Sequence, residues 1–120
     1  GGHNTLGATA ISKWLKSYKK NKTFKSTILI FGLLQNKDAQ KILSILKGEV
    51  DKIIFVPIEN NKNIYSNKDL KIISSSLSID SSESDSLSFA LKSIKGIKDS
   101  LIIIFGSLYL VGEFLKINKD

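Results

Sequence analysis

The sequence predicts an α/β fold, a doubly wound and mostly parallel sheet with helices on both faces. Three continuous runs of β-branched and apolar residues, at 27–31, 53–56 and 101–105, are typical of strands that are buried on both faces of a sheet. Segments with apolar residues at three- and four-residue spacing separate these runs, which is the order of crossover helices in a parallel sheet. The 120 residues, 42% of them hydrophobic, provide one core, so residues 1–120 are expected to form a single domain.

Two amphipathic helices are expected in the first half of the chain. The first runs from about Asn4 to Lys19, and its apolar face carries Leu6, Ala10, Ile11, Trp14, Leu15 and Tyr18. On this spacing Trp14 is predicted to lie in the core. The second helix begins after Asp38, which is a suitable N-cap, and Gly48 is expected to stop it. Its apolar face carries Ala39, Ile42, Leu43 and Leu46.

The second half of the chain predicts shorter elements. A polar, asparagine-rich loop is expected at 59–66, a short helix at 67–75 and a short strand at 77–79. The spacing Ser82-x-x-Asp85 is that of a capping box, and it predicts the start of a helix that carries Leu87, Ala90, Leu91 and Ile94. After the strand at 101–105, a last helix is expected to carry Leu108, Val111, Phe114 and Leu115.

The composition excludes several classes of protein. The absence of cysteine excludes a disulfide scaffold, a thiolate metal site and a cysteine nucleophile, and with a single histidine no metal site is expected. No apolar run approaches the roughly 18–20 residues of a membrane span, so no membrane partner is expected. All eighteen basic residues are scattered lysines, without the arginines and interleaved aromatic residues of a nucleic-acid surface, so no nucleic acid is expected despite the net charge of +7.

The start of the chain bears on its context. The sequence has no methionine and begins Gly1-Gly2-His3-Asn4, so we expect it to be part of a longer protein. With no cysteine and no signal peptide at the start of the sequence, the expected location is the cytoplasm.

Three loops are placed where ligands bind in open α/β sheets, outside the carboxyl ends of strands and near helix N-termini. They are residues 1–4, residues 32–38 after the first strand, and Gly106-Ser107 after the last one. Glycine allows the backbone to approach a ligand, and a helix N-terminus favours an anion. Since neither a Walker A sequence nor G-x-G-x-x-G is present, spacing alone predicts an anion-binding α/β domain and nothing more specific.

Each candidate residue also has a purely structural interpretation. His3 at the start of the chain is consistent with a solvated side chain, and Lys37 is one of eighteen lysines, a residue type found mostly at the surface. Ser107 and Asp38 are both suitable helix N-caps. No pair of carboxylates in the sequence suggests a general acid–base couple, so no catalytic residue is assigned in this chain.

Taken together, the three loops resemble motifs of one enzyme family, the folylpolyglutamate synthases and the related dihydrofolate synthases. Gly1-Gly2-His3-Asn4 resembles the end of that family's D-G-A-H-N-P motif. The segment from Ile30 to Asp38, which contains Gly32 and Lys37, is similar to its strand–Gly–x–x–x–D-K-D segment. The run Gly106-Ser107-Leu108-Tyr109-Leu110 resembles its closing G-S-L-Y-L motif. The motifs occur in the family's order and at about its separations, so the resemblance covers the whole chain.

The resemblance implies that the chain is the C-terminal, Rossmann-like domain of a Mur-ligase-type enzyme. Such enzymes use ATP to activate a carboxylate as an acyl phosphate, which the amine of an amino acid attacks. The implied amino acid is L-glutamate, and the implied acceptor is a folate or dihydropteroate. The motifs place His3, Lys37 and Ser107 at the glutamate, and Gly1, Gly2 and Asn4 toward the nucleotide. ATP and Mg²⁺ are implied for the full-length enzyme, bound mainly by an N-terminal ATPase domain whose P-loop is absent from this sequence.

The sequence departs from the family's motifs at three places. Thr5 stands where the family has proline, Asn36 stands for the first acid of D-K-D, and the aspartate before Gly1 is absent. Because the P-loop is absent as well, the 120-residue chain alone is expected to be inactive. Two alternatives stay open: a stand-alone, non-catalytic α/β ligand-binding module, and a domain of an amino-acid ligase with another acceptor.

Overall fold

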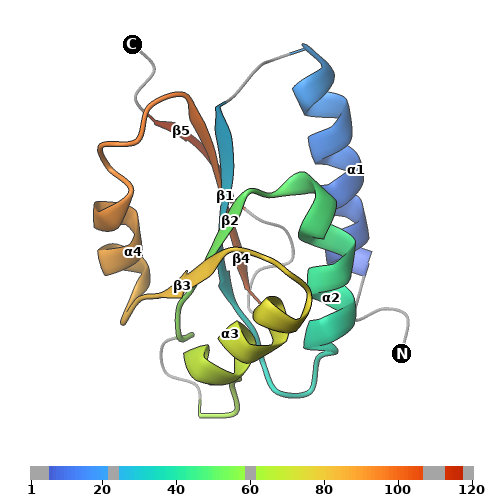
Figure 1. Ribbon diagram of the computed structural model, residues 1–120, viewed down its shortest axis with the longest axis vertical. Helices are drawn as coiled ribbons and strands as arrows, with labels where there is room; N and C mark the ends of the chain where they lie inside the picture. The colour runs from blue at the N-terminus through green and yellow to red at the C-terminus, as the bar shows by residue number, and fades with distance from the viewer. Residues whose placement is uncertain (1–5, 22–24, 59–61, 107–112, 118–120) are drawn as a thin grey trace.

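A five-stranded sheet lies between two layers of helices in the computed structural model, which describes residues 6–21, 25–58, 62–106 and 113–117 (Figure 1). The elements follow one another in the order α1 (Leu6–Asn21), β1 (Ser26–Gly32), α2 (Ala39–Leu46), the 3-10 turn η2 (Lys47–Glu49), β2 (Lys52–Phe55), α3 (Asn67–Ser76), β3 (Ser81–Glu83), α4 (Leu87–Ser93), β4 (Ser100–Gly106) and β5 (Glu113–Ile117). None of the helices in this part of the chain is long and apolar enough to cross a membrane.

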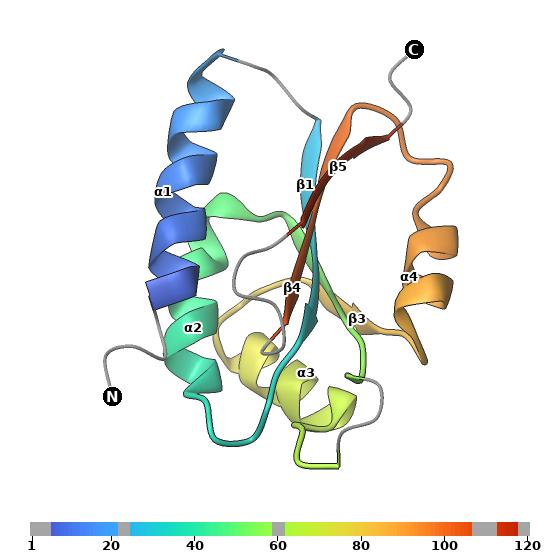
Figure 2. The same ribbon diagram turned by 180° about the vertical axis from the view of Figure 1, so that it is seen from behind.

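The sheet confirms the predicted topology. Its strand order is β3-β2-β1-β4-β5, with β1 to β4 mutually parallel and β5 antiparallel to β4. Helices α1, α2 and α3 cover one face, and α4 covers the other, as the two opposite views show (Figures 1 and 2). The chain therefore winds in both directions from the middle of the sheet, because β1 leads through α2 to β2 while β4 is reached through α4.

The two faces of β1 explain why its sequence is a continuous apolar run. Leu29 and Phe31 point into the larger core under α1, α2 and α3, whereas Ile28 and Ile30 point into the smaller core under α4. Each of these four side chains is 2% exposed or less. Phe31 also stacks on Phe105 of β4, with ring centroids 5.4 Å apart, which joins the two central strands within the larger core.

The strand predicted at 77–79 is wrong, because that segment ends helix α3. The N–H of Leu77 donates to carbonyls of the last helical turn, and Ser78 turns the chain with a φ of 61°. The strand begins only at Ser81, where β3 is polar because it pairs with β2 alone at the edge of the sheet. The predicted capping box is also wrong, because Ser82 lies within β3 and not at the start of a helix. The side chain of Ser86 caps α4 instead, accepting from the N–H of Phe89 at 3.1 Å.

The last expected helix is a strand. The last helix was expected to carry Phe114 and Leu115, but both lie in strand β5, opposite Ile103 and Ile102 of β4. The apolar strand β4 needs backbone partners along its second edge, and an antiparallel strand supplies them. Leu108 and Val111, the other residues of that expected helix, lie outside the described residues.

Trp14 is not in the core. Its side chain is 37% exposed and stacks on Tyr18 with ring centroids 4.4 Å apart, while Ala8, Ile11 and Leu15 supply the buried face of α1. Trp14 therefore lies at the border of the apolar stripe, where periodicity alone does not separate a buried from a half-exposed position. Gly48 does not stop α2 either, because helical turns continue through η2.

Replacing Gly32 with alanine is expected to lower the free energy of unfolding by about 1–3 kcal/mol. The added Cβ would lie 2.7 Å from the carbonyl oxygen of Val56 and 3.0 Å from Cγ1 of Ile58. Gly48→Ala is the matched control, since nothing lies within 4 Å of its Cβ position, and it is expected to add about 0.4–1 kcal/mol. Urea unfolding of the chain measures both, and a Gly32→Ala variant as stable as the wild type would contradict the close approach.

Candidate functional site

Two motif glycines end the central strands side by side. Gly32 of β1 and Gly106 of β4 are register partners in the parallel ladder. They lie at the carboxyl edge of the sheet, between the strands where the winding reverses, which is the place where ligands bind in open α/β sheets. In Figure 1 this edge is at the bottom, where β1 leads into the loop before α2.

The loop after Gly32 is folded into a turn that ends in a helix cap. Leu33 is buried, and the N–H of Lys37 donates to the carbonyl of Leu34 at 3.1 Å. Asp38 then caps α2, its carboxylate accepting from the N–H of Lys41 at 3.1 Å. The interpretation of Asp38 as a helix cap is confirmed, and half-buried Lys37 is held directly before the first turn of α2.

A second segment, which precedes α3, lies along this loop. The N–H of Gln35 donates to the carbonyl of Asn63 at 2.9 Å, and the N–H of Tyr65 donates to the carbonyl of Leu33 at 2.9 Å. Leu34 and Ile64 form an antiparallel bridge between these two bonds. The hydroxyl of Tyr65 also donates to the carbonyl of Lys37 at 2.7 Å.

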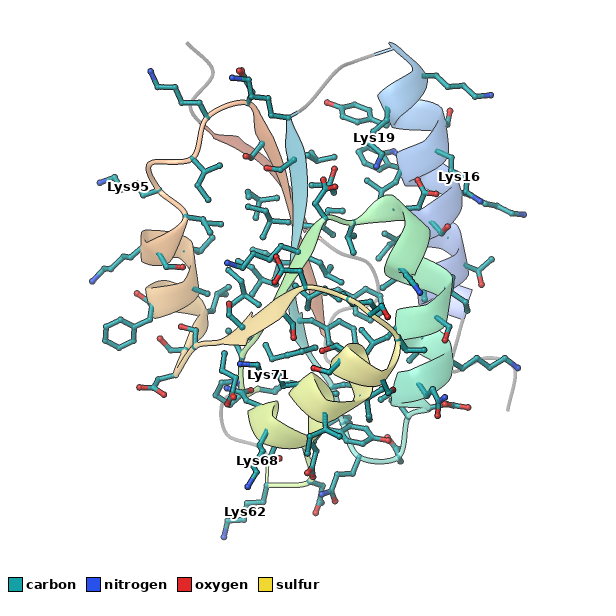
Figure 3. All side chains as sticks on the ribbon, viewed as in Figure 1. Lys16, Lys19, Lys62, Lys68, Lys71 and Lys95 are labelled. Atoms are coloured by element: carbon teal, nitrogen blue, oxygen red, sulfur yellow. The ribbon has the colours of Figure 1, made fainter. Side chains whose placement is uncertain are left out.

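An open pocket of about 470 Å³ lies between the two segments, and its described lining residues are Leu34, Gln35, Asn36 and Asn63. Gln35, Asn36 and Asn63 carry side-chain amides, which both donate and accept hydrogen bonds. Lys62 and Lys68 lie at the same end of the molecule (Figure 3), adding positive charge near the pocket, which favours an anionic ligand.

Among the predicted site residues, Lys37 is the one that the structure describes. Gly1, Gly2, His3, Asn4 and Ser107 lie outside the described residues, so their proposed roles stay predictions. Analysis of the sequence missed Asn63 and Tyr65, which it assigned to a polar loop. The pair Ile64-Tyr65 was the available signal, because two apolar residues inside an asparagine-rich stretch indicate a segment that packs. Tyr65 does pack against the larger core.

The sheet order, the helices on both faces and the paired glycines at the switch point define a Rossmann-like α/β domain. The chain belongs to the family of dihydrofolate synthetase C-terminal domains, whose family model matches residues 1–117. The resemblance based on three motifs is thereby confirmed. A comparison with curated proteins finds no match.

Two solved structures share the fold. One is FolC of E. coli in complex with ADP and without folate substrate, with a TM-score of 0.71 and 18% sequence identity. The other is folylpolyglutamate synthetase of Helicobacter pylori, with a TM-score of 0.62 and 20% identity. Each similarity covers 86% of this chain and 24% of the solved chain, so this chain spans only that share of each longer protein.

Asp38→Ala is expected to lower the free energy of unfolding by about 1 kcal/mol, because the first turn of α2 loses its cap. Asp38→Asn is the matched variant, since an asparagine side chain also caps, and it is expected to remain close to the wild type. Urea unfolding of both variants makes the comparison. Equal stability of the alanine and asparagine variants would show that the cap contributes nothing.

Proposed function

We propose that this chain is the C-terminal domain of a longer ATP-dependent ligase that adds L-glutamate to a folate or dihydropteroate acceptor. The observation that carries the proposal is the family match over residues 1–117. The two similar structures support it, because one is a folylpolyglutamate synthetase and the other was solved with ADP. Both are longer proteins, and the match covers 24% of each, which leaves room in them for an ATPase domain outside the matched part.

In this proposal the chain delivers the amino acid and leaves the phosphate chemistry to the other domain. Lys37 provides a cation in the same loop as Gln35 and Asn36 of the pocket, and glutamate offers carboxylates to both kinds of donor. Ser107 follows Gly106, the register partner of Gly32, and His3 completes the proposed glutamate site. Holding the glutamate amine close to an activated carboxylate promotes ligation through positioning.

ATP and Mg²⁺ are assigned to the ATPase domain, with Gly1, Gly2 and Asn4 as nucleotide-facing residues of this chain. Among the described residues, no group of three or more histidine, aspartate or glutamate side chains is placed to hold a metal ion. The sequence also contains no Walker A lysine loop for the phosphates. The proposed role of this chain is to bind and orient the amino acid, and it includes no step at the metal.

Lys37→Ala in the full-length protein is expected to raise the KM for L-glutamate about 10- to 100-fold. A hydrogen bond to a charged group contributes about 1.5–3 kcal/mol, which corresponds to that range. Glutamate-dependent ADP release with a folate acceptor is the measurement. The matched control is Lys47→Ala, which removes an exposed lysine from η2, beyond the end of α2, and is expected to leave KM unchanged.

The outcomes separate the proposed function from its alternatives. An unchanged KM in Lys37→Ala would remove Lys37 from the glutamate site. ADP release that depends on an amino acid but needs an acceptor other than a folate or dihydropteroate would identify a related amino-acid ligase. A reading frame without an ATPase domain would identify a stand-alone binding module.

The 120-residue chain alone is expected to release no ADP from ATP above a buffer control, even with glutamate and folate present. The reason is that its sequence carries no P-loop. The full-length protein, assayed in parallel, is the positive control. Turnover by the isolated chain would contradict the assignment of the nucleotide chemistry to another domain.

A further inference from the structure

Residues 63–65 form a clasp on the Lys37 turn. The clasp contacts the turn at its start, through the bond from Tyr65 N–H to the Leu33 carbonyl, and in its middle, through the bond from Gln35 N–H to the Asn63 carbonyl. It also contacts the end of the turn, where the Tyr65 hydroxyl donates to the Lys37 carbonyl at 2.7 Å. The contacts span the turn from Leu33 to Lys37, so the clasp holds the turn along its length.

The phenol of Tyr65 links the turn to the core. Its ring is partly buried against the larger hydrophobic cluster, which includes Leu33 and Phe31. A tyrosine ring has few rotatable bonds, so a packed ring holds its hydroxyl at a defined point. From that point the hydroxyl donates a hydrogen bond to the carbonyl of Lys37, which precedes α2 and lies outside any helix or strand. The backbone of Lys37 is therefore fixed by a residue 28 positions away in sequence.

Both polar groups of the Lys37 backbone are engaged. Its N–H donates to Leu34 within the turn, and its carbonyl accepts from Tyr65 of the clasp. Fixing both peptide groups restricts the φ and ψ of Lys37, and these angles set the direction in which its side chain leaves the backbone. The next residue, Asp38, is fixed in turn by its role as the cap of α2.

We propose that Tyr65 is a positioning residue that holds Lys37 in its binding geometry for the amino-acid carboxylate. This inference rests on the proposed function, and it adds a residue that acts through Lys37 without touching the ligand itself. Preorganising a binding group lowers the conformational cost of binding, so loss of the Tyr65 hydroxyl weakens binding while leaving the charge of Lys37 in place.

Tyr65→Phe in the full-length protein tests the proposal, because it removes the hydroxyl and keeps the packed ring. The KM for L-glutamate is expected to rise about 3- to 10-fold, the range of one neutral hydrogen bond, with kcat within about twofold of the wild type.

The Lys37→Ala, Tyr65→Phe double variant is expected to resemble Lys37→Ala alone, since Tyr65 acts through Lys37. Tyr18→Phe is the matched control, a half-buried tyrosine of α1 that is expected to change neither constant.

Hydrogen–deuterium exchange supplies a second readout that needs no substrate. In Tyr65→Phe, peptides that cover residues 33–38 are expected to exchange faster, whereas peptides from β1 are expected to be unchanged, because β1 is paired on both sides. The Tyr18→Phe variant is expected to match the wild type throughout residues 33–38.

The two readouts distinguish failure of this inference from failure of the proposed function. An unchanged KM or unchanged exchange over residues 33–38 in Tyr65→Phe, with an active wild type, would overturn the positioning role. Full additivity of the two substitutions in the double variant would also overturn it. A wild-type protein that ligates no glutamate would overturn the proposed function, and exchange would then still decide whether Tyr65 holds the turn.

Discussion

The pairing of β1 with β4 in the middle of the sheet is the constraint on which the rest of the structure depends. The two strands are in register from Ser26 and Ser100 to Gly32 and Gly106. The second edge of β1 pairs with β2, and its side chains are buried on both faces. Since both backbone and side chains are fixed in this way, Gly32 and Gly106 end the two strands at fixed and adjacent points.

The fixed ends of β1 and β4 set where the following segments start, but they do not by themselves order the loop between β1 and α2. The loop between β1 and α2 receives it from two directions, the Asp38 cap in its own chain segment and the clasp from the segment before α3. The result is a well-supported loop on a rigid scaffold, and such an arrangement lowers the cost of ordering a side chain that binds a ligand. For a domain proposed to deliver an amino acid to chemistry performed elsewhere, such order is its main contribution to the reaction.

The sequence predicted the fold best where burial is complete. The runs at 27–31, 53–56 and 101–105 all proved to be parallel strands, because a strand buried on both faces has to be apolar at every position. The edge strands were missed. Polar β3 is specified by its pairing with β2, and β5 by its pairing with β4, and neither pairing leaves a pattern in the local sequence.

In the candidate site, too, the features set by neighbouring residues in the sequence were predicted, and those set by contacts between distant segments were not. Lys37 was found because the order of glycine, lysine and aspartate in one short segment resembles a family motif, and the cap at Asp38 follows from local sequence. The clasp was not found, because its bonds to the turn use mainly backbone groups, which any sequence carries, and because it lies more than twenty residues along the chain. The one side-chain hydrogen bond of the clasp is donated by the Tyr65 hydroxyl to the Lys37 carbonyl. Tyr65, which sequence analysis assigned to a loop, therefore links the larger core to the candidate site.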